Sequence, residues 1–345
     1  MKEPLFGKTI SELGEIATQN GFPGFTAGQI ADWLYKKNCS SIDEMSNLSR
    51  KNRDILAEKY TVGRHSHTNV QTSVDGTKKY LFAAQSGKFI EAAFIPEKTR
   101  STLCLSSQVG CKMGCLFCMT GKQGFQGNLG AGDILNQVAS LPEREELTNI
   151  VYMGMGEPLD NTEEVLKSLE ILTSGWGYAM SPRRITVSTI GIVPGMKKFL
   201  EESECHLAIS LHSPFDEERK RLMPVQNVYT IRDVLTEVRK FDWTKQRRIS
   251  IEYIMFRDLN DTDGHVRELA RILNGVKVRI NLIKFHPIPD TPLLGSPMEK
   301  MIEFRDKLNE KGITATIRRS RGEDIYAACG LLSTKSLAGE IDKDF

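Results

Sequence analysis

The sequence lacks long apolar runs, a strong excess of charge, internal repeats and low-complexity tracts. No apolar stretch approaches the roughly 18 residues of a membrane-spanning helix, so we expect a soluble, cytoplasmic protein. Lys and Arg number 46 against 44 Asp and Glu, a net charge of +2. The total charge therefore indicates no nucleic-acid surface, although local basic patches can bind RNA. The 345 residues allow roughly two domains with a large buried core.

A disulfide framework is also not indicated, because three of the seven cysteines are clustered on one short stretch. Cys111, Cys115 and Cys118 have the spacing CxxxCxxC. Three such thiols can ligate three irons of a cubane iron-sulfur cluster and leave the fourth iron open to a substrate or cofactor. A structural zinc site or a ferredoxin-type carrier needs a fourth ligand nearby, and the sequence has none there. Three buried structural thiols are the less favoured alternative.

The first 96 residues divide into a helical part and a β part. Apolar residues recur with helical spacing over residues 1–60, which predicts three or four short helices. Basic residues there are nearly balanced by acids, so a solvated face and an RNA contact both remain open. Three short strands are predicted at 70–74, 79–83 and 88–95, separated by hairpin turn signals.

From residue 100 onward, predicted strands alternate with predicted helices. This alternation favours a parallel sheet that closes or half closes into a barrel, with the chemistry on loops that follow the strands. The predicted strands are 102–106, 149–153, 184–188, 206–211, 249–254, 278–283 and 314–318. The predicted helices are 131–141, 162–172, 193–202, 231–241, 263–273 and 298–311.

Glu91 is a candidate general base. In the strand 88–95 it shares a face with the apolar residues Phe89, Ala93 and Ile95. Burial would raise the pKa of a carboxyl placed in this way, which suits proton transfer. The alternative, left open by these residues alone, is an inward charge that protects a sheet edge.

Several polar motifs lie at predicted strand ends. The sequence GMGEP at 154–158 follows the second barrel strand, and its glycines allow a ligand to approach the backbone closely. A purely structural Gly-rich turn is the alternative. Ser188 ends the third strand, Ser210-Leu211-His212 ends the fourth, and His286 precedes a proline after the sixth. A lone histidine at such a place is more often structural than a ligand.

Two further cysteines lie at the ends of the predicted barrel. Cys104 is in the first strand and Cys329 follows the last. If the sheet wraps round so that these strands approach, both thiols reach the same mouth. The run Arg318, Arg319 and Arg321 next to Cys329 suits phosphate recognition, although exposed charge runs are usually only solvated.

Cys39 and Cys205 have no motif around them, and we expect them to be small buried apolar residues.

The cluster motif, with Phe117 before its last cysteine, resembles the radical S-adenosylmethionine superfamily. The stretch 102–111, the cluster loop through Gly124 and Phe125, the GMGEP, residues 210–212 and residues 321–330 together resemble the RlmN-type dual-specificity RNA methyltransferases, over nearly the whole chain. This resemblance implies an α/β fold: a partial (β/α) radical SAM barrel with a small N-terminal helical accessory domain and a β-hairpin extension. The expected divisions are an RNA-binding domain at 1–60, a β-rich connection at 61–96, the barrel at 97–335 and a tail at 336–345.

The resemblance also implies roles for individual residues. Cys329 would become the S-methylcysteine intermediate, Cys104 would resolve the RNA adduct by forming a disulfide with Cys329, and Glu91 would accept the proton of carbon 2. His286 departs from the asparagine found in many relatives. Three cysteines would bind a [4Fe-4S] cluster: Cys111, Cys115 and Cys118. The S-adenosylmethionine pocket would comprise Gly156, Glu157, Ser188, Ser210, Leu211, His212 and His286.

The implied activity is methylation of carbon 2 of an adenosine in 23S rRNA and of an anticodon-loop adenosine in tRNAs. Carbon 2 of adenine is electron-poor and cannot attack a methyl group, so a radical route is required. The resemblance further implies two S-adenosylmethionine molecules per turnover, a flavodoxin or ferredoxin as electron donor, no membrane partner and a monomer. The alternatives are a Cfr-type carbon-8 methyltransferase that confers antibiotic resistance, a radical enzyme on a non-RNA substrate, and a non-enzymatic iron-sulfur or RNA-binding module.

Overall fold

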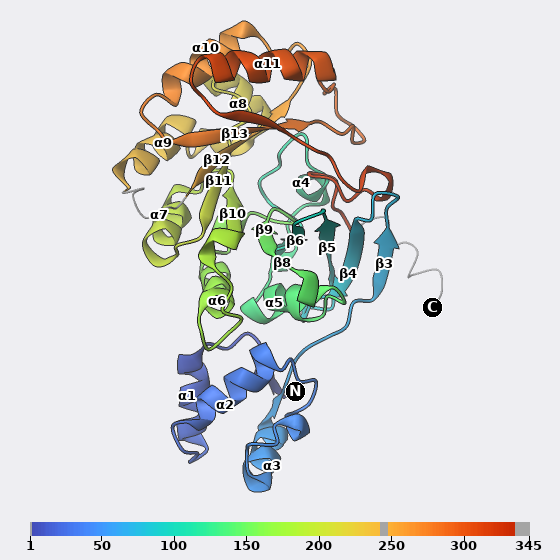
Figure 1. The fold of residues 1–345 in the computed structure, drawn as a ribbon, viewed down its shortest axis with the longest axis vertical. Helices are drawn as coiled ribbons and strands as arrows, with labels where there is room; N and C mark the ends of the chain where they lie inside the picture. The colour runs from blue at the N-terminus through green and yellow to red at the C-terminus, as the bar shows by residue number, and fades with distance from the viewer. Residues whose placement is uncertain (1, 242–247, 335–345) are drawn as a thin grey trace.

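A curved central sheet covered by helices forms the main body of the protein, and a small helical region is attached at one end (Figure 1). The computed structural model describes residues 2–241 and 248–334. The expected tail at 336–345 lies outside these residues. No helix in the described part of the chain is long and apolar enough to cross a membrane.

Ten strands form the central sheet in the order β14-β13-β12-β11-β10-β9-β6-β5-β4-β3. From β6 to β14 neighbouring strands are parallel, which confirms the predicted barrel strands. The sheet continues antiparallel through β5, β4 and β3, so the predicted hairpins extend the barrel sheet itself. The parallel strands are β6 (Ser101–Leu105), β9 (Asn149–Tyr152), β10 (Ile185–Thr189), β11 (His206–Ser210), β12 (Ile249–Met255), β13 (Val278–Lys284) and β14 (Ala315–Arg318). The antiparallel strands are β3 (Asn69–Thr72), β4 (Lys78–Ala83) and β5 (Phe89–Pro96).

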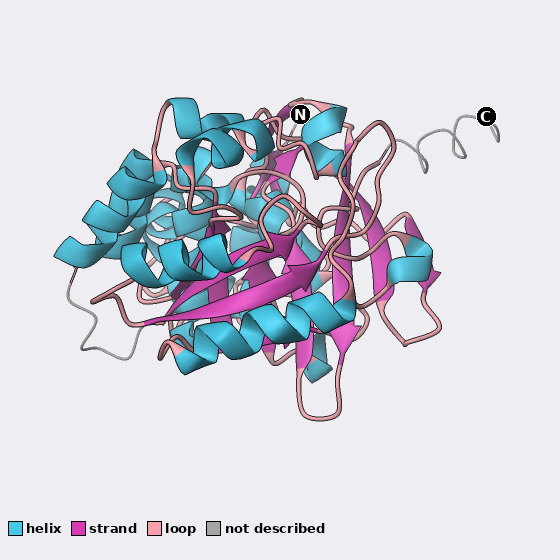
Figure 2. Cartoon of the chain, turned by 90° about the horizontal axis from the view of Figure 1, so that it is seen from above, coloured by secondary structure: helices cyan, strands magenta, loops and turns pink. Residues whose placement is uncertain are grey.

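Most helices lie on the outer side of this curved sheet (Figure 2). All six predicted helices form, with bounds that differ by at most two residues: α5 (Ala131–Ala139), α6 (Thr162–Thr173), α7 (Val193–Glu202), α9 (Ile231–Lys240), α10 (Asp263–Ile272) and α11 (Met298–Glu310). Two helices were not predicted. α8 (Asp216–Leu222) is highly charged and has no apolar stripe, and α4 (Met119–Gln123) is too short to show a period. The short connecting elements are β7 (Gln108–Val109), β8 (Gly127–Asn128), η3 (Arg144–Glu146), η4 (Pro158–Asp160), η5 (Pro182–Arg184), η6 (Pro224–Asn227) and η7 (Glu323–Ile325).

The N-terminal region contains the short helices expected from its spacing. A capping box begins the first of them, because Thr9 Oγ1 accepts from the N–H of Glu12 while the Glu12 carboxylate accepts from the N–H of Thr9. A two-stranded parallel pair joins the start and the end of the region. Its elements are β1 (Glu3–Pro4), α1 (Ile10–Gln19), α2 (Thr26–Ala31), η1 (Asp32–Lys36), η2 (Ile42–Glu44), α3 (Arg50–Lys59) and β2 (Tyr60–Thr61).

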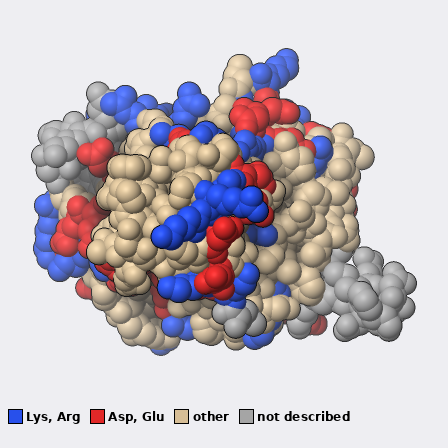
Figure 3. Space-filling model, turned by 90° about the horizontal axis from the view of Figure 1, so that it is seen from below, with Lys and Arg blue, Asp and Glu red and all other residues tan. Residues whose placement is uncertain are grey.

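Charges of both signs lie side by side on the face seen from the N-terminal end (Figure 3). Lys37 Nζ lies 3.0 Å from the Asp32 carboxylate, and Lys8 Nζ lies 2.5 Å from the Glu3 carboxylate. This face therefore carries no field of a single sign, in line with the near-neutral net charge.

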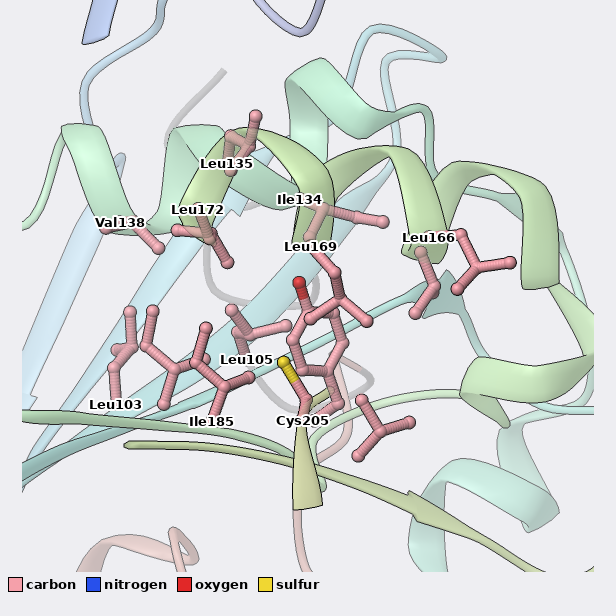
Figure 4. Close-up of a cluster of buried hydrophobic side chains, with 14 of the residues drawn as sticks. Leu103, Leu105, Ile134, Leu135, Val138, Leu166, Leu169, Leu172, Ile185 and Cys205 are labelled. Atoms are coloured by element: carbon pink, nitrogen blue, oxygen red, sulfur yellow. The ribbon is translucent and has the colours of Figure 1, made fainter. Parts of the chain in front are cut away.

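The hydrophobic core lies between the sheet and its covering helices (Figure 4). Successive residues of a strand point to opposite faces, so Leu103 and Leu105 of β6 face this core while Cys104 between them faces the inside of the curve. Cys39 and Cys205 are buried in the core, as expected. The core residues labelled in Figure 4 are Leu103, Leu105, Ile134, Leu135, Val138, Leu166, Leu169, Leu172, Ile185 and Cys205.

The sheet wraps round far enough for its last parallel strand to approach the first ones, because Arg318 Nη1 of β14 lies 3.4 Å from Met153 Sδ just after β9. Strands β14 and β3 are the two edges of the sheet, so in the described chain no strand pairing closes the barrel. Residues 319–334, here called the Cys329 segment, cross from β14 to the β3–β4 hairpin instead. The Asp324 carboxylate accepts hydrogen bonds from Ser73 Oγ (2.5 Å) and from the N–H of Val74 (3.1 Å). This segment brings Cys329 toward the other end of the sheet.

Candidate active site

A cavity of about 1480 Å³ occupies the inside of the curved sheet. Its wall includes residues of all seven parallel strands and of the loops after them. Most of the predicted site residues line it: Cys104, Cys111, Cys115, Cys118, Gly156, Glu157, Ser188, Ser210, His212, His286 and Cys329. Glu91 and Leu211 do not line it, and each is described below.

The cluster loop follows β6 and is held in a tight conformation by glycine. Gly110 has φ +69°, and a Cβ there would lie 1.7 Å from the carbonyl oxygen of Gly124. The loop also docks on α8, because the N–H of Leu116 donates to the carbonyl of Leu222 at 3.0 Å. Cys111 and Cys115 are buried and Cys118 is half-buried.

Burial and neighbouring thiols raise the pKa values of cysteines in the cluster loop. Burial raises the pKa of Cys111 to about 12, with Cys118 adding to the rise. Burial, Cys118 and Cys111 raise the pKa of Cys115 well above its usual range. No group of three ligands suited to a single metal ion occurs among the described residues. Three cysteine thiolates on one loop that lines the cavity fit three irons of a cubane cluster.

The GMGEP loop approaches the cluster loop so closely that only glycine fits. Gly156 has φ +99°, and a Cβ there would lie 2.5 Å from Gln108 Cβ. The Glu157 carboxylate is buried, accepting from Thr189 Oγ1 (2.6 Å) and from the N–H groups of Ile190 (3.0 Å) and Leu159 (3.1 Å). Burial raises the pKa of Glu157 to about 7. Because the Glu157 carboxylate already accepts three hydrogen bonds from the protein, the GMGEP loop can offer a ligand its backbone N–H and C=O groups.

His212 is a neutral hydrogen-bond donor at the cavity wall. Its Nδ1 accepts from the N–H of Ile254 at 3.0 Å, which assigns the proton to Nε2. Burial, together with the nearby Arg219 charge, lowers the pKa of His212 to about 3. Its ring meets that of Phe117 edge to face, with centroids 4.8 Å apart. The last aromatic residue of the cluster motif thus holds the histidine beside the cluster loop.

The remaining predicted pocket residues differ in what they present. Ser188 and Ser210 are half-buried and line the cavity. The Leu211 side chain is buried in the core, its N–H donates to Glu252 and its carbonyl accepts from Ser213, so it does not form part of the wall. His286 lines the cavity, but its Nε2 lies 2.9 Å from Ser320 Oγ and its Nδ1 lies 3.5 Å from the Glu323 carboxylate. His286 therefore contacts the Cys329 segment.

Cys104 and Cys329 are brought to the same part of the cavity, and both are free thiols. Burial raises the pKa of Cys104 to about 12; the Cys329 charge also raises it and the Arg318 charge lowers it. Ala327 packs against Cys104 and Ala93 in a small buried cluster. Arg318 faces inward between the two thiols and Glu252, whereas Arg319 is exposed and Arg321 lies 3.8 Å from the Asp75 carboxylate.

Glu91 is fully buried beside the cavity, beneath the Cys329 segment. Its Oε2 accepts from the N–H of Ser333 at 2.9 Å, and its Oε1 lies 3.2 Å from Lys79 Nζ. Burial raises the pKa of Glu91, and the Lys79 charge opposes the rise. The prediction that Glu91 points inward is confirmed.

Lys79 and Glu252 are among the buried charged residues that the sequence reasoning missed. Lys79 is 3% exposed, and the alternation of strand β4 would have placed it on the same inner side as Glu91. Glu252 lines the cavity; its Oε1 accepts from Ser250 Oγ and Asn281 Nδ2. Its Oε2 accepts no hydrogen bond from the described residues.

Comparison with known proteins agrees with this geometry. Residues 105–271 match the model of the radical SAM superfamily, and residues 4–62 match that of the ribosomal RNA large subunit methyltransferase N-terminal domain. A probable dual-specificity RNA methyltransferase RlmN from Parabacteroides distasonis is 55% identical over 96% of this chain and 97% of its own length. The corresponding protein of Campylobacter hominis is 41% identical over 97% of this chain and 98% of its own. The crystal structure of a radical SAM methyltransferase from Sphaerobacter thermophilus is 37% identical, with a TM-score of 0.90, and covers 96% of this chain and 100% of its own.

The chain belongs to the RlmN family. Membership in the radical SAM superfamily implies a [4Fe-4S] cluster and S-adenosylmethionine, and Cys111, Cys115 and Cys118 are the residues that fit the cluster. Glu91, Cys104 and Cys329 lie outside the superfamily match at 105–271. In this RlmN chain the three candidate cluster ligands thus lie within the superfamily match, whereas these three candidates come from the flanking segments.

Proposed function

We propose that the protein methylates carbon 2 of an adenosine in 23S rRNA and of an anticodon-loop adenosine in tRNA, with Cys329 as carrier of the methyl carbon. The main supporting observation is that Cys104 and Cys329 line one cavity together with the three cluster cysteines. An electron carrier has no use for two such thiols. The dual-specificity RNA methyltransferases named above, similar over nearly the whole chain, support the RNA substrate class.

The cofactors would bind at the carboxyl ends of the strands. Cys111, Cys115 and Cys118 would hold the cluster, and S-adenosylmethionine would bind between Gly156 and His212. The Nε2–H of His212, whose Nδ1 accepts from Ile254, would donate a hydrogen bond there. When bound, the cluster and S-adenosylmethionine supply the radical chemistry: a deoxyadenosyl radical that removes a hydrogen atom, and an acceptor for the electron released afterwards. Two S-adenosylmethionine molecules would be used per turnover.

The two thiols would act in sequence. The Cys329 sulfur first accepts a methyl group from S-adenosylmethionine and loses its proton. After removal of a hydrogen atom, that carbon bonds to carbon 2 of the adenine, which tethers the RNA to Cys329. The Cys104 thiol then loses its proton and attacks the Cys329 sulfur. An S–S bond forms, the S–CH2 bond breaks, and the electron pair stays on the carbon, which takes up a proton and leaves on the RNA as a methyl group.

Glu91 would remove the proton from carbon 2 before this resolution step. Glu91 is on β5, which pairs with β6, the strand of Cys104. Ala93, two residues after Glu91, lies directly opposite Cys104. A buried carboxylate is a stronger base than an exposed one, which suits proton abstraction from carbon.

The N-terminal region would contribute to RNA binding, and a flavodoxin or ferredoxin would supply the electron. The mixed charges of that region favour recognition of RNA shape and local contacts over a strong uniform field (Figure 3). We further propose that the protein acts as a monomer in the cytoplasm.

Mass spectrometry of Cys329 and of the RNA tests this function. In protein expressed with S-adenosylmethionine available we expect a methyl group on Cys329, and in Cys104→Ala we expect RNA covalently trapped on the enzyme. Digested 23S rRNA should contain 2-methyladenosine. Methylation at carbon 8 would favour the Cfr-type alternative, and an unmethylated Cys329 with no trapped RNA would overturn the proposal in favour of a non-RNA substrate.

A further inference from the structure

Lys79 is a buried cation that contacts Glu91 and, among the described residues, no other carboxylate within 4 Å. Lys79 of β4 lies opposite Ala93 of β5, and Ala93 lies opposite Cys104 of β6, so the three form one row across the sheet. Glu91 is one pleat along from Ala93 on the same face. Because Ala93 has only a methyl group, the Lys79 side chain can reach across it. The Lys79 ammonium thereby lies 3.2 Å from Glu91 Oε1.

Both partners of this ion pair are almost completely removed from water. Lys79 is 3% exposed and Glu91 is 0% exposed. A buried charge is expensive unless it is paired, so neither group would remain charged at this place without the other. Glu91 Oε1 has no other polar contact in the described chain, and Oε2 has the N–H of Ser333. Lys79 is therefore the main group that stabilises the ionised form of Glu91.

We propose that Lys79 is a positioning residue that keeps the Glu91 carboxylate ionised and directed so that it can take the proton of carbon 2 from the Cys329-linked adenine. This inference rests on the proposed function and adds a residue to it. In the step concerned, the C–H bond at carbon 2 breaks, its electron pair stays in the purine ring and the proton moves to Glu91. A protonated Glu91 could not accept it.

The other groups that face Glu91 carry no charge that could replace Lys79. On β6, Ser106 Oγ donates to the Glu91 carbonyl, and Cys104 lies opposite Ala93, two residues along from Glu91. Burial raises the pKa of Cys104 to about 12, so this thiol is neutral near pH 7. On the loop after β9, the Met155 sulfur contacts the N–H of Glu91. On the Cys329 segment, the contact is the backbone N–H of Ser333. Burial raises the pKa of Glu91 and Lys79 is the charged group that lowers it, so loss of Lys79 should raise this pKa further.

The experiment compares wild type, Lys79→Met, Lys79→Arg, Glu91→Gln and the double variant Lys79→Met/Glu91→Gln. Infrared spectra of the full-length proteins are recorded against pH. Subtracting the spectrum of the matching Glu91→Gln protein isolates the Glu91 carboxyl. In Lys79→Met we expect the midpoint of its titration to move up by about one to three pH units, and in Lys79→Arg we expect it to stay near the wild-type value. This readout needs neither RNA nor methyltransferase activity, so it decides the proposal even if the proposed function fails.

The kinetic readout is the pH dependence of adduct resolution in single-turnover reactions. In Lys79→Met the rate of resolution should begin to rise only at a higher pH than in wild type, because Glu91 is ionised only above its pKa. In the Glu91→Gln background the same substitution should have no further effect. An unchanged infrared midpoint, or equal slowing in both backgrounds, would overturn the proposal.

Lys78→Met is the matched control. Lys78 is the neighbouring residue on the opposite face of β4 and pairs with Glu143 at 2.5 Å, so its loss should leave both readouts unchanged. If Lys79→Met does not fold, Lys79→Gln, which also removes the positive charge but keeps a polar group beside Glu91, provides the same comparison with wild type.

Discussion

The backbone N–H of Ser333 donates a 2.9 Å hydrogen bond to Glu91 Oε2, joining residues 242 positions apart in the chain. The segment that carries Cys329 thus also covers the candidate proton acceptor. Glu91 has no exposed surface while this contact is in place, so an adenine can reach it only if the segment moves. The segment's contacts with the rest of the protein should therefore affect activity as well as stability.

Asp324 is the main polar contact of this segment with the β3–β4 hairpin. Asp324→Asn should weaken the hydrogen bonds to Ser73 and to the N–H of Val74, because an amide accepts at only one oxygen. We expect proteolysis within residues 319–334 to become several-fold faster, and Cys104–Cys329 chemistry to slow, while the melting temperature of the barrel changes little. Limited proteolysis followed by mass spectrometry measures the first effect. Asp54→Asn, exposed on α3, is the control; equal cleavage in both variants would contradict the expectation.

Gly110 should be required for the cluster loop. In Gly110→Ala the new Cβ would lie 1.7 Å from the Gly124 carbonyl oxygen, at a φ of +69° that side chains rarely adopt. The loop must move, and we expect a loss of about 3 kcal/mol or more in stability together with a large fall in bound iron after reconstitution. Iron and sulfide analysis is the measurement. Gly175→Ala, where a Cβ meets nothing within 4 Å, should bind iron as wild type does; a full complement of iron in Gly110→Ala would refute this prediction.

His212 should bind S-adenosylmethionine as a neutral donor. Its pKa of about 3 means that the ring does not change charge between pH 5 and pH 9. His212→Ala should weaken S-adenosylmethionine binding by about tenfold, by the same factor at pH 6 and pH 8. Equilibrium binding to the reconstituted protein tests this. His212→Asn, which can still donate a hydrogen bond, should recover part of the affinity, and a pH-dependent loss would show that the imidazolium binds instead.

How far the sequence predicts this site depends on whether a residue's place follows from a local repeat. The spacing of Cys111, Cys115 and Cys118 predicts a cluster, and all three residues line the cavity. Strand alternation predicts that Glu91 points inward, and Glu91 is buried. The same alternation applies to Lys79, but the pairing of β4 with β5 must be known before the two charges can be placed together. A motif match does not show where a side chain points: that of Leu211 lies in the core.

The closure of the barrel could not be predicted from local pattern. The Cys329 segment has no regular repeat, and its position depends on contacts such as that between Asp324 and Ser73, 251 positions apart. Only the folded sheet brings those two residues together. The sequence therefore indicated that Cys104 and Cys329 reach the same mouth if the sheet wraps round, but it did not show that the Cys329 segment crosses to the β3–β4 hairpin.

Glu157 should make the stability of the protein depend on pH. Its pKa is about 7 in the folded protein against 4.5 for an ordinary glutamate, because the carboxyl is buried. The folded state therefore binds a proton more tightly than the unfolded state does. This contribution is fully present below pH 4.5 and is lost as pH rises through about 7, by at most about 3 kcal/mol. Glu157→Gln removes it.

Urea unfolding of the protein without its cluster, at pH 5 and at pH 8, measures the effect. Wild type should lose more stability between the two pH values than Glu157→Gln does. The variant should be less stable overall, because its amide cannot accept all the hydrogen bonds that Thr189, Ile190 and Leu159 donate. Other titrating groups are common to both proteins, so the difference isolates Glu157. Glu201→Gln, at an exposed position on α7, should retain the wild-type pH dependence. If wild type and Glu157→Gln change equally with pH, the Glu157 carboxyl does not titrate in this range.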